Sequence, residues 1–116
     1  MPVLNRANIP ASGVDAVSMN VTVTGTRSNS YGGYVTVYPC GTVPDASSLN
    51  FTTGQTVPNA AIARVSANGT VCVMVYGEAD VIIDVNGWFG TNLGFAGMTP
   101  VRVSDTRRGI GSVPGK

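Results

Sequence analysis

One short segment constrains the fold of this chain more than any other. In residues 17–24, valine or methionine alternates strictly with serine, asparagine or threonine. A period of two is that of a β-strand, whose successive side chains point to opposite faces, whereas a helix repeats about every 3.6 residues. The segment therefore predicts a strand with one buried face. The residues expected in the core are Val17, Met19, Val21 and Val23, and those expected outside are Ser18, Asn20, Thr22 and Thr24.

Further strand patterns follow, separated by segments rich in glycine, proline, asparagine and serine. Val35 and Val37 are expected to share an inward face, as are Leu49 and Phe51. The run 71–75 is apolar on both faces, as expected of a central strand. The apolar runs beyond the first lie at 34–38, 48–52, 60–66, 71–76, 81–85 and 99–104.

Three glycine-containing turns divide these runs. Asn68-Gly69 lies between two apolar runs and predicts a hairpin, because both residues tolerate the positive φ of a type I′ turn. Gly77-Glu78 predicts a second tight turn, and Asn86-Gly87 is expected to end a strand. Seven or eight short strands joined by such turns predict an all-β fold, an antiparallel β-sandwich of jelly-roll or Ig-like type.

The length of 116 residues is that of one domain. We expect a β-sandwich core over residues 1–90 and a linker over 91–98, where glycines interrupt the chain. A C-terminal strand is expected at 99–107. A flexible tail is expected at 108–116, which is rich in glycine, serine and proline.

Charged residues are scarce, at 11% of the chain against roughly 25% in a typical soluble domain. Hydroxyl, amide and glycine residues must cover the surface instead, and we interpret this neutral coat as that of a secreted or cell-surface protein. The net charge of +1 would attract neither nucleic acid nor an anionic membrane. No apolar run is long enough to span a membrane, and residues 1–6 do not form a signal peptide, so export would need a signal upstream.

The chain has two cysteines, Cys40 and Cys72, and no histidine. These ligands are too few for a four-ligand zinc site. From the residues alone, two alternatives stay open: a disulfide, or two buried free thiols. In an oxidising compartment we expect the disulfide, which would close a long loop and stabilise the fold by about 3–4 kcal/mol.

The sequence predicts no catalytic apparatus. Without histidine, a serine or cysteine nucleophile lacks its usual base, and the acidic residues show no spacing typical of a carboxylate pair or a calcium loop. We therefore expect no catalytic residue, no metal site and no cofactor. Asp84 is expected to face outward from its strand or to bind a turn amide. The acidic residues considered are Asp15, Asp45, Glu78, Asp80, Asp84 and Asp105.

Aromatic side chains offer candidate ligand contacts. Tyr34 and Tyr38 are expected on one face of one strand, together with Thr36, and Trp88 follows a later strand. Exposed aromatic rings on a neutral, hydroxyl-rich sheet suit stacking against sugars. Packing in the core or across strands is the alternative for the same three aromatic residues.

Several segments together resemble one protein family. They are residues 9–14 (IPASGV), 33–41 (GYVTVYPCG), 84–89 (DVNGWF) and 99–107 (TPVRVSDTR). The family is a repeat module of large secreted and surface proteins of actinobacteria, where it accompanies peptidases, amidases and other hydrolases or forms tandem arrays. The last segment resembles the family signature TPVRLLDTR, with Val103-Ser104 in place of two leucines.

The resemblance implies a β-rich extracellular accessory domain with no catalytic residues to transfer. It also implies a Cys40–Cys72 disulfide, because both residues stand at family cysteine positions. In the tandem arrays the DTR segment precedes the PASGV strand, whereas here it follows. The C-terminal strand is therefore expected to complete either its own sandwich or that of a neighbouring copy. The residues expected to dock it are Val101, Arg102, Val103, Asp105 and Arg107, with Asp105 ion-paired to Arg102 or Arg107.

Together these observations predict a non-catalytic extracellular structural or adhesive module that associates with copies of itself, through tandem repetition or exchange of its C-terminal strand. The alternative is a carbohydrate- or cell-wall-binding accessory module of a secreted hydrolase, whose partner would be a cell-wall polysaccharide. Both functions act through binding, and neither requires a chemical step at the protein.

Overall fold

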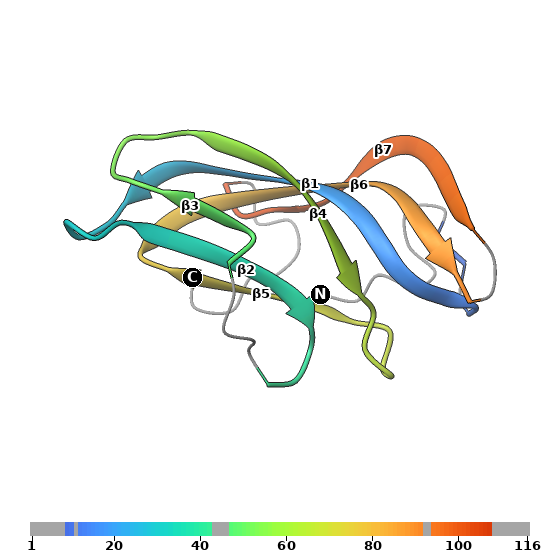
Figure 1. Cartoon of the computed structure of the whole chain (residues 1–116). Coiled ribbons are helices and arrows are strands. Elements are labelled where there is room, and N and C mark those ends of the chain that lie inside the picture. The colour runs from blue at the N-terminus through green and yellow to red at the C-terminus, as the bar shows by residue number, and fades with distance from the viewer. Residues whose placement is uncertain (1–8, 11, 43–46, 92–93, 108–116) are drawn as a thin grey trace.

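The computed structural model describes residues 9–10, 12–42, 47–91 and 94–107. The described residues form an all-β fold without helices, and thus contain no helix able to cross a membrane. The strands are β1 (Val14–Arg27), β2 (Gly33–Pro39), β3 (Leu49–Phe51), β4 (Val57–Arg64), β5 (Val71–Tyr76), β6 (Glu78–Gly90) and β7 (Phe95–Asp105) (Figure 1).

The strands form two antiparallel sheets that pack against each other. One sheet has the order β4-β1-β6-β7 and the other has the order β3-β2-β5. The predicted antiparallel β-sandwich is therefore confirmed. Figure 1 shows the long strands β1 and β6 side by side across the whole molecule, with β2 and β5 beneath one half of them.

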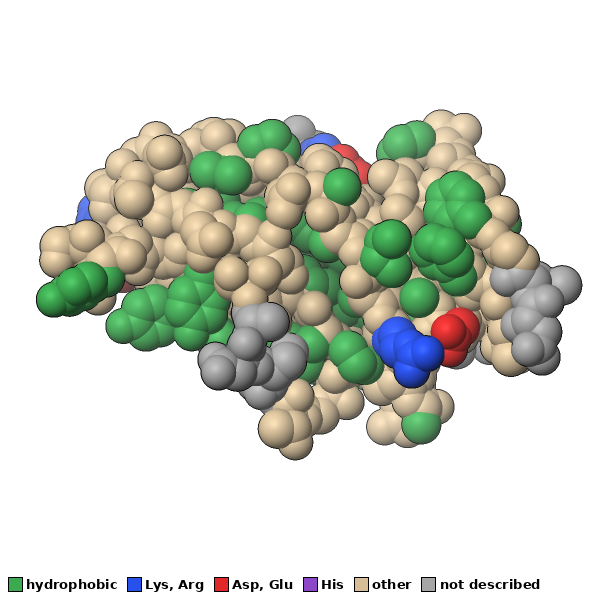
Figure 2. Space-filling view, in the orientation of Figure 1, with side chains coloured by type: hydrophobic (Ala, Val, Ile, Leu, Met, Phe, Trp, Pro, Cys, Tyr) green, Lys and Arg blue, Asp and Glu red, His purple; other side chains and the backbone are tan. Residues whose placement is uncertain are grey.

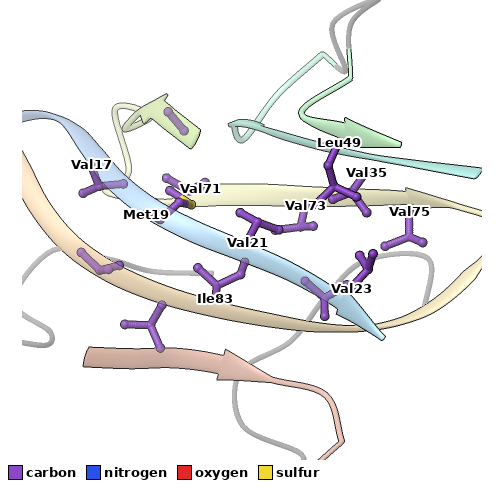
Figure 3. Packing of buried hydrophobic residues seen from close by; sticks show 14 of the residues in the cluster. Val17, Met19, Val21, Val23, Val35, Leu49, Val71, Val73, Val75 and Ile83 are labelled. Atoms are coloured by element: carbon purple, nitrogen blue, oxygen red, sulfur yellow. The ribbon is translucent and has the colours of Figure 1, made fainter. Parts of the chain in front are cut away.

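The core consists of the side chains that the two sheets direct toward each other. Val17, Met19, Val21 and Val23 of β1 are all 0% exposed, as the alternation predicts. In Figure 3, Val21 lies beside Val73 of β5 in this layer. Complete burial of a valine or methionine side chain contributes roughly 1.5–3 kcal/mol, so β1 alone supplies a large share of the hydrophobic stabilisation. Leu49 and Phe51 are buried too, whereas Val37 is half-buried at the margin of the core.

The predicted hairpin at Asn68-Gly69 and the predicted tight turn at Gly77-Glu78 both prove to be crossings between the sheets. Gly69 has a φ of 75°, and Ser66 donates from its backbone N–H to the carbonyl of Thr70 at 2.9 Å, so a tight turn is present. The strands that flank it nevertheless separate, because β4 pairs with β1 whereas β5 pairs with β2. The turn at Gly77, with a φ of 100°, likewise leads from β5 into the other sheet. The turns lie where the sequence predicts them, but local turn chemistry does not determine the pairing partner of the next strand.

β5 was expected to be a central strand, and this expectation was wrong for the part of the chain that the structure describes. β5 lies at an edge of the three-stranded sheet, next to β2. The apolar residues on the two faces of β5 have different roles. Val71, Val73 and Val75 face the core, whereas the opposite face carries the disulfide sulfur of Cys72 and the ring of Tyr76.

Asn86-Gly87 was expected to end a strand, but β6 continues to Gly90. Ser18 and Met19 of β1 lie opposite Gly87 and Val85, so Asn86 is an extra residue, a β-bulge. Gly87 is required because a Cβ there would overlap the ring of Phe95. The bulge shifts the alternation by one residue, and Trp88 then packs against the core.

The segment 91–98 was expected to be a linker, but β7 already begins at Phe95. Phe95 pairs with Phe89 across the β6–β7 connection, and their rings lie 5.1 Å apart. This aromatic contact explains why strand pairing starts at once despite the glycines of the segment. The expected tail at 108–116 lies outside the described residues.

The structure contains the expected disulfide between Cys40 and Cys72, with Cα atoms 4.8 Å apart. Cys40 follows directly after β2 and Cys72 lies within β5, opposite Tyr38. The bond therefore fixes the register of two paired strands at one end of the smaller sheet.

Removal of this disulfide should lower the free energy of unfolding by about 3–4 kcal/mol, the loop-entropy value for a separation of 32 residues. We expect this loss in urea denaturation of the double variant Cys40→Ser/Cys72→Ser. A reductant should lower the stability of the wild type to a similar extent and leave the variant unchanged. Equal stability of the oxidised wild type and the variant would contradict the prediction.

Candidate functional site

The C-terminal strand β7 is docked on β6 of its own chain. The two strands are antiparallel, with Phe89 opposite Phe95 and Ile82 opposite Asp105. Of the two arrangements expected from the sequence, this one completes the chain's own sandwich. β7 forms the edge of the four-stranded sheet, and among the described strands it pairs with β6 alone.

Apolar side chains provide the first part of the docking. Ile83 pairs with Ser104, and the next residue of β6, Asp84, pairs with Arg102. Val103 is therefore an extra residue on β7 and forms a β-bulge. Its side chain is 1% exposed and belongs to the hydrophobic core. Val101 is half-buried opposite Val85. Both valines expected to dock the strand thus face β6 or the core.

An arginine–carboxylate pair joins the outer faces of the two strands. Arg102 donates from Nε to Oδ1 of Asp84 at 2.8 Å and from Nη2 to Oδ2 at 3.2 Å. This two-point geometry is the strongest form of such a pair. Because Asp84 and Arg102 lie opposite each other in the register, the pair also fixes the alignment of β7. Asp84 faces outward as the sequence indicated, but its partner is a side chain.

Asp105 is the centre of a second, buried cluster. Its side chain is 0% exposed, and Arg107 donates to it from Nε at 3.0 Å, from Nη2 at 3.0 Å and from the backbone N–H at 3.1 Å. Arg102 contributes a weaker contact from Nη1 at 3.4 Å. The hydrogen bonds from Arg107, opposed by burial and reinforced by the charge of Arg102, lower the pKa of Asp105 from its ordinary 3.8 to about 2. The ion pair expected between Asp105 and Arg102 or Arg107 is therefore formed with both arginines.

Thr106 extends the pairing beyond the end of β7. Its backbone N–H donates to the carbonyl of Val81 at 3.0 Å, and its Oγ1 accepts from the backbone N–H of Val81 at 2.9 Å. The same hydroxyl donates to Oδ1 of Asp80 at 3.0 Å. Thr106 and Asp80 were not among the residues expected to dock the strand. The segment Asp105-Thr106-Arg107 did indicate a turn, because an Asp side chain often accepts a hydrogen bond from the backbone N–H two residues later, as Asp105 does from Arg107.

The three candidate stacking residues do not form one surface. Tyr38 is only 7% exposed, and Trp88 packs against the core from the other sheet. Tyr34 is half-buried and stacks on Tyr76 of β5, its partner in the register, with ring centroids 5.2 Å apart and planes at 13°. Tyr38 is thus buried, Trp88 packs against the core, and Tyr34 packs across strands, as the alternative to sugar stacking predicts. Tyr76, which the sequence did not single out, joins Tyr34 instead.

Comparisons with protein-family models, with curated proteins and with solved structures found no match. We refer below to the set Asp80, Asp84, Arg102, Asp105, Thr106 and Arg107 as the β7 clamp.

The β7 clamp should make the stability of the fold fall with pH between about pH 4 and pH 2. Because the pKa of Asp105 is about 2 in the folded protein and 3.8 ordinarily, its contribution is complete above about pH 4 and is lost as the pH falls toward 2. In thermal denaturation between pH 6 and pH 2, Asp105→Asn should be less stable than the wild type at pH 6. The two should converge as the pH falls toward 2.

Asp15→Asn is the matched control, because it removes a carboxylate of equal charge that lies on the surface 3.9 Å from Arg64. A constant difference between wild type and Asp105→Asn across the whole pH range would contradict the assignment.

Proposed function

We propose that this protein is a non-catalytic structural module of the secreted or cell-surface class, and that it associates with copies of itself through β7. One observation carries the proposal. The hydrogen bonds and ion pairs that join Arg102, Thr106 and Arg107 to Asp84, Asp80 and Asp105 lie within β7 and the turn after it or between them and β6. A β7 strand from another copy would present the same groups to the same partners.

Exchange of β7 between copies would preserve the docking energy described above. The same backbone pairing, the same burial of Val103 and the same Asp84–Arg102 pair form in either arrangement. A closed monomer and an exchanged assembly then differ in whether β7 docks on β6 of its own chain or on β6 of another copy. Such exchange of an identical element is a low-cost route to self-association.

The role of the acidic side chains supports a function without catalysis. Asp84 and Asp105 bind arginines, and Asp80 accepts a hydrogen bond from Thr106. Among the described residues, no buried side-chain nitrogen or oxygen lacks a hydrogen-bond partner. These carboxylates hold strands together, and the chain has no histidine to serve as a base.

The disulfide and the low charge support an extracellular setting. Disulfides persist mainly in oxidising compartments such as the cell exterior. The family that the sequence resembles forms tandem arrays. In such an array, residues 99–107 would pair with β6 of the same unit and so complete that unit's larger sheet. Exchange at this position would link successive units or separate chains.

A charge-reversal pair of full-length variants tests the exchange. Asp84→Arg places two cations together, and Arg102→Asp places an anion between Asp84 and Asp105, so each variant alone should dock its own β7 poorly. When the two variants are refolded together from urea with the disulfide intact, β7 of the first can dock on β6 of the second with the native charges. We expect the heterodimer to be the main species in native mass spectrometry and size-exclusion chromatography with light scattering.

The control reverses the exposed Asp15–Arg64 pair in the same way, with Asp15→Arg and Arg64→Asp, because this pair lies away from β7. The mixed control variants should remain monomeric. Monomers in the Asp84→Arg and Arg102→Asp mixture, together with a wild type that stays monomeric at every concentration, would rule out the proposed self-association.

A carbohydrate- or cell-wall-binding accessory module is the second candidate function. The observation that favours it is the exposure of Tyr31 and Tyr76, at 95% and 49%, at one end of the molecule. Exposed tyrosine rings suit contact with sugars on a surface that carries little charge.

A further inference from the structure

Three tyrosines lie at the end of the sandwich where β1 turns into β2. Tyr31 occupies the β1–β2 turn, Tyr34 lies near the start of β2, and Tyr76 is the last residue of β5. Tyr34 and Tyr76 are stacked neighbours, and Tyr76 remains half exposed. Figure 2 shows hydrophobic side chains gathered at this end of the molecule, at the left of the view, below the β1–β2 turn.

The turn that carries Tyr31 is held by specific hydrogen bonds. Asn29 accepts from the backbone N–H of Tyr31 through Oδ1 at 3.0 Å and from the N–H of Gly32 through its carbonyl at 3.1 Å. Gly32 has a φ of 91°, a conformation that favours glycine. The turn thus presents an aromatic ring that is 95% exposed on a fixed backbone.

The loop between β3 and β4 supports the same end of the molecule. Oγ1 of Thr26 donates to the carbonyls of Thr52 and Gln55, at 3.0 and 2.6 Å. The backbone N–H of Ser28 donates to Oγ1 of Thr53 at 2.9 Å, and that hydroxyl donates back to the carbonyl of Ser28 at 3.2 Å. These bonds tie the two loops together, so the tyrosines are bordered by ordered hydroxyl and amide groups.

The charge near the tyrosines is balanced. Arg27 and Glu78 lie opposite each other where β1 and β6 meet, and they carry opposite charges. The loop residues Ser28, Asn29 and Ser30 are neutral. The surface therefore complements neither an anionic nor a cationic polymer, whereas it offers aromatic faces and hydrogen-bonding groups side by side.

We propose that Tyr31, Tyr34 and Tyr76 form a binding site for a neutral polysaccharide. The apolar C–H faces of the sugar rings would stack on Tyr31 and Tyr76, with Tyr34 supporting the ring of Tyr76 from behind. Hydroxyl and amide groups of the adjoining loops would bind the sugar hydroxyls. Tyrosine suits this task because it combines a large apolar ring with a polar group at its tip. The inference rests on the second candidate function and is independent of β7 exchange.

A second copy of the chain is a poorer occupant than a glycan. A stable dimer interface is generally built around a continuous apolar core and buries about 800 Å² on each partner. The exposed large apolar side chains at this end are tyrosines bordered by polar loops, and Ile62 and Phe95 belong to the other sheet. Separate exposed rings among polar loops match a chain of sugars better than a broad protein surface.

Isothermal titration of the full-length protein with cellohexaose, chitohexaose and maltohexaose tests the site, with hyaluronan as an anionic comparison. We expect at least one neutral hexasaccharide to bind, and hyaluronan not to bind. Tyr31→Ala and Tyr76→Ala should each weaken binding about 3- to 10-fold, the value of one aromatic contact. Ile62→Ala is the matched control, because this residue is 65% exposed on β4 and should leave binding unchanged.

Tyr31→Ala should keep the wild-type melting temperature, since its side chain is almost fully exposed. Absence of binding to all three neutral hexasaccharides, or binding unaffected by both tyrosine variants, would overturn the proposal. Concentration-dependent dimers that Tyr31→Ala abolishes would also overturn it, because a second copy would then cover the tyrosines. The charge-reversal variants of β7 should bind as the wild type does, so failure of one proposal does not imply failure of the other.

Discussion

Burial of one face of β1 is the constraint on which the other strands depend. β1 lies between β4 and β6, and four of its side chains are fully buried against the opposite sheet. Because side chains alternate strictly, a slip of one residue in either pairing would turn these apolar groups to the solvent. The register of both neighbours is thereby determined from the centre of the larger sheet. β7 then pairs with a β6 that β1 has already aligned.

Most ion pairs of the described residues lie at β7, the strand that apolar packing holds least firmly. β7 is an edge strand whose main apolar contribution is the side chain of Val103. Its alignment relies on the two-point pair of Arg102 with Asp84 and on the buried carboxylate of Asp105. An apolar strand in this place would pair with many registers, whereas opposite charges at fixed positions favour one. Electrostatics thus supplies specificity at the edge, and burial supplies stability at the centre.

The fold class and the inward residues of β1 and β3 could be predicted because they depend on local alternation. The hairpin expected at Asn68-Gly69 and the central place expected for β5 failed for one reason, which is that sequence proximity does not reveal which sheet a strand joins. Asn68-Gly69 does form a turn, yet β4 and β5 diverge after it. Asn86-Gly87 resembles a strand end, yet a bulge lets β6 continue, and only the ring of Phe95 above Gly87 explains the glycine. Asp105 and its arginines could be anticipated from their motif, but Asp80 lies on another strand and its contact with Thr106 depends on the register.

The relative direction of β1 and β7 has a mechanical consequence. Both strands are antiparallel to β6 and flank it, with Val14 at the Gly90 end and Asp105 opposite Ile82. These two points are roughly 26 Å apart along β6, at about 3.3 Å per residue. Tension applied through the start of β1 and the end of β7 would pull the strands along β6 in opposite directions. The ladder hydrogen bonds run across the strands, so many of them would bear the load in shear at the same time. A domain loaded in this way resists extension far better than one whose strands peel apart bond by bond.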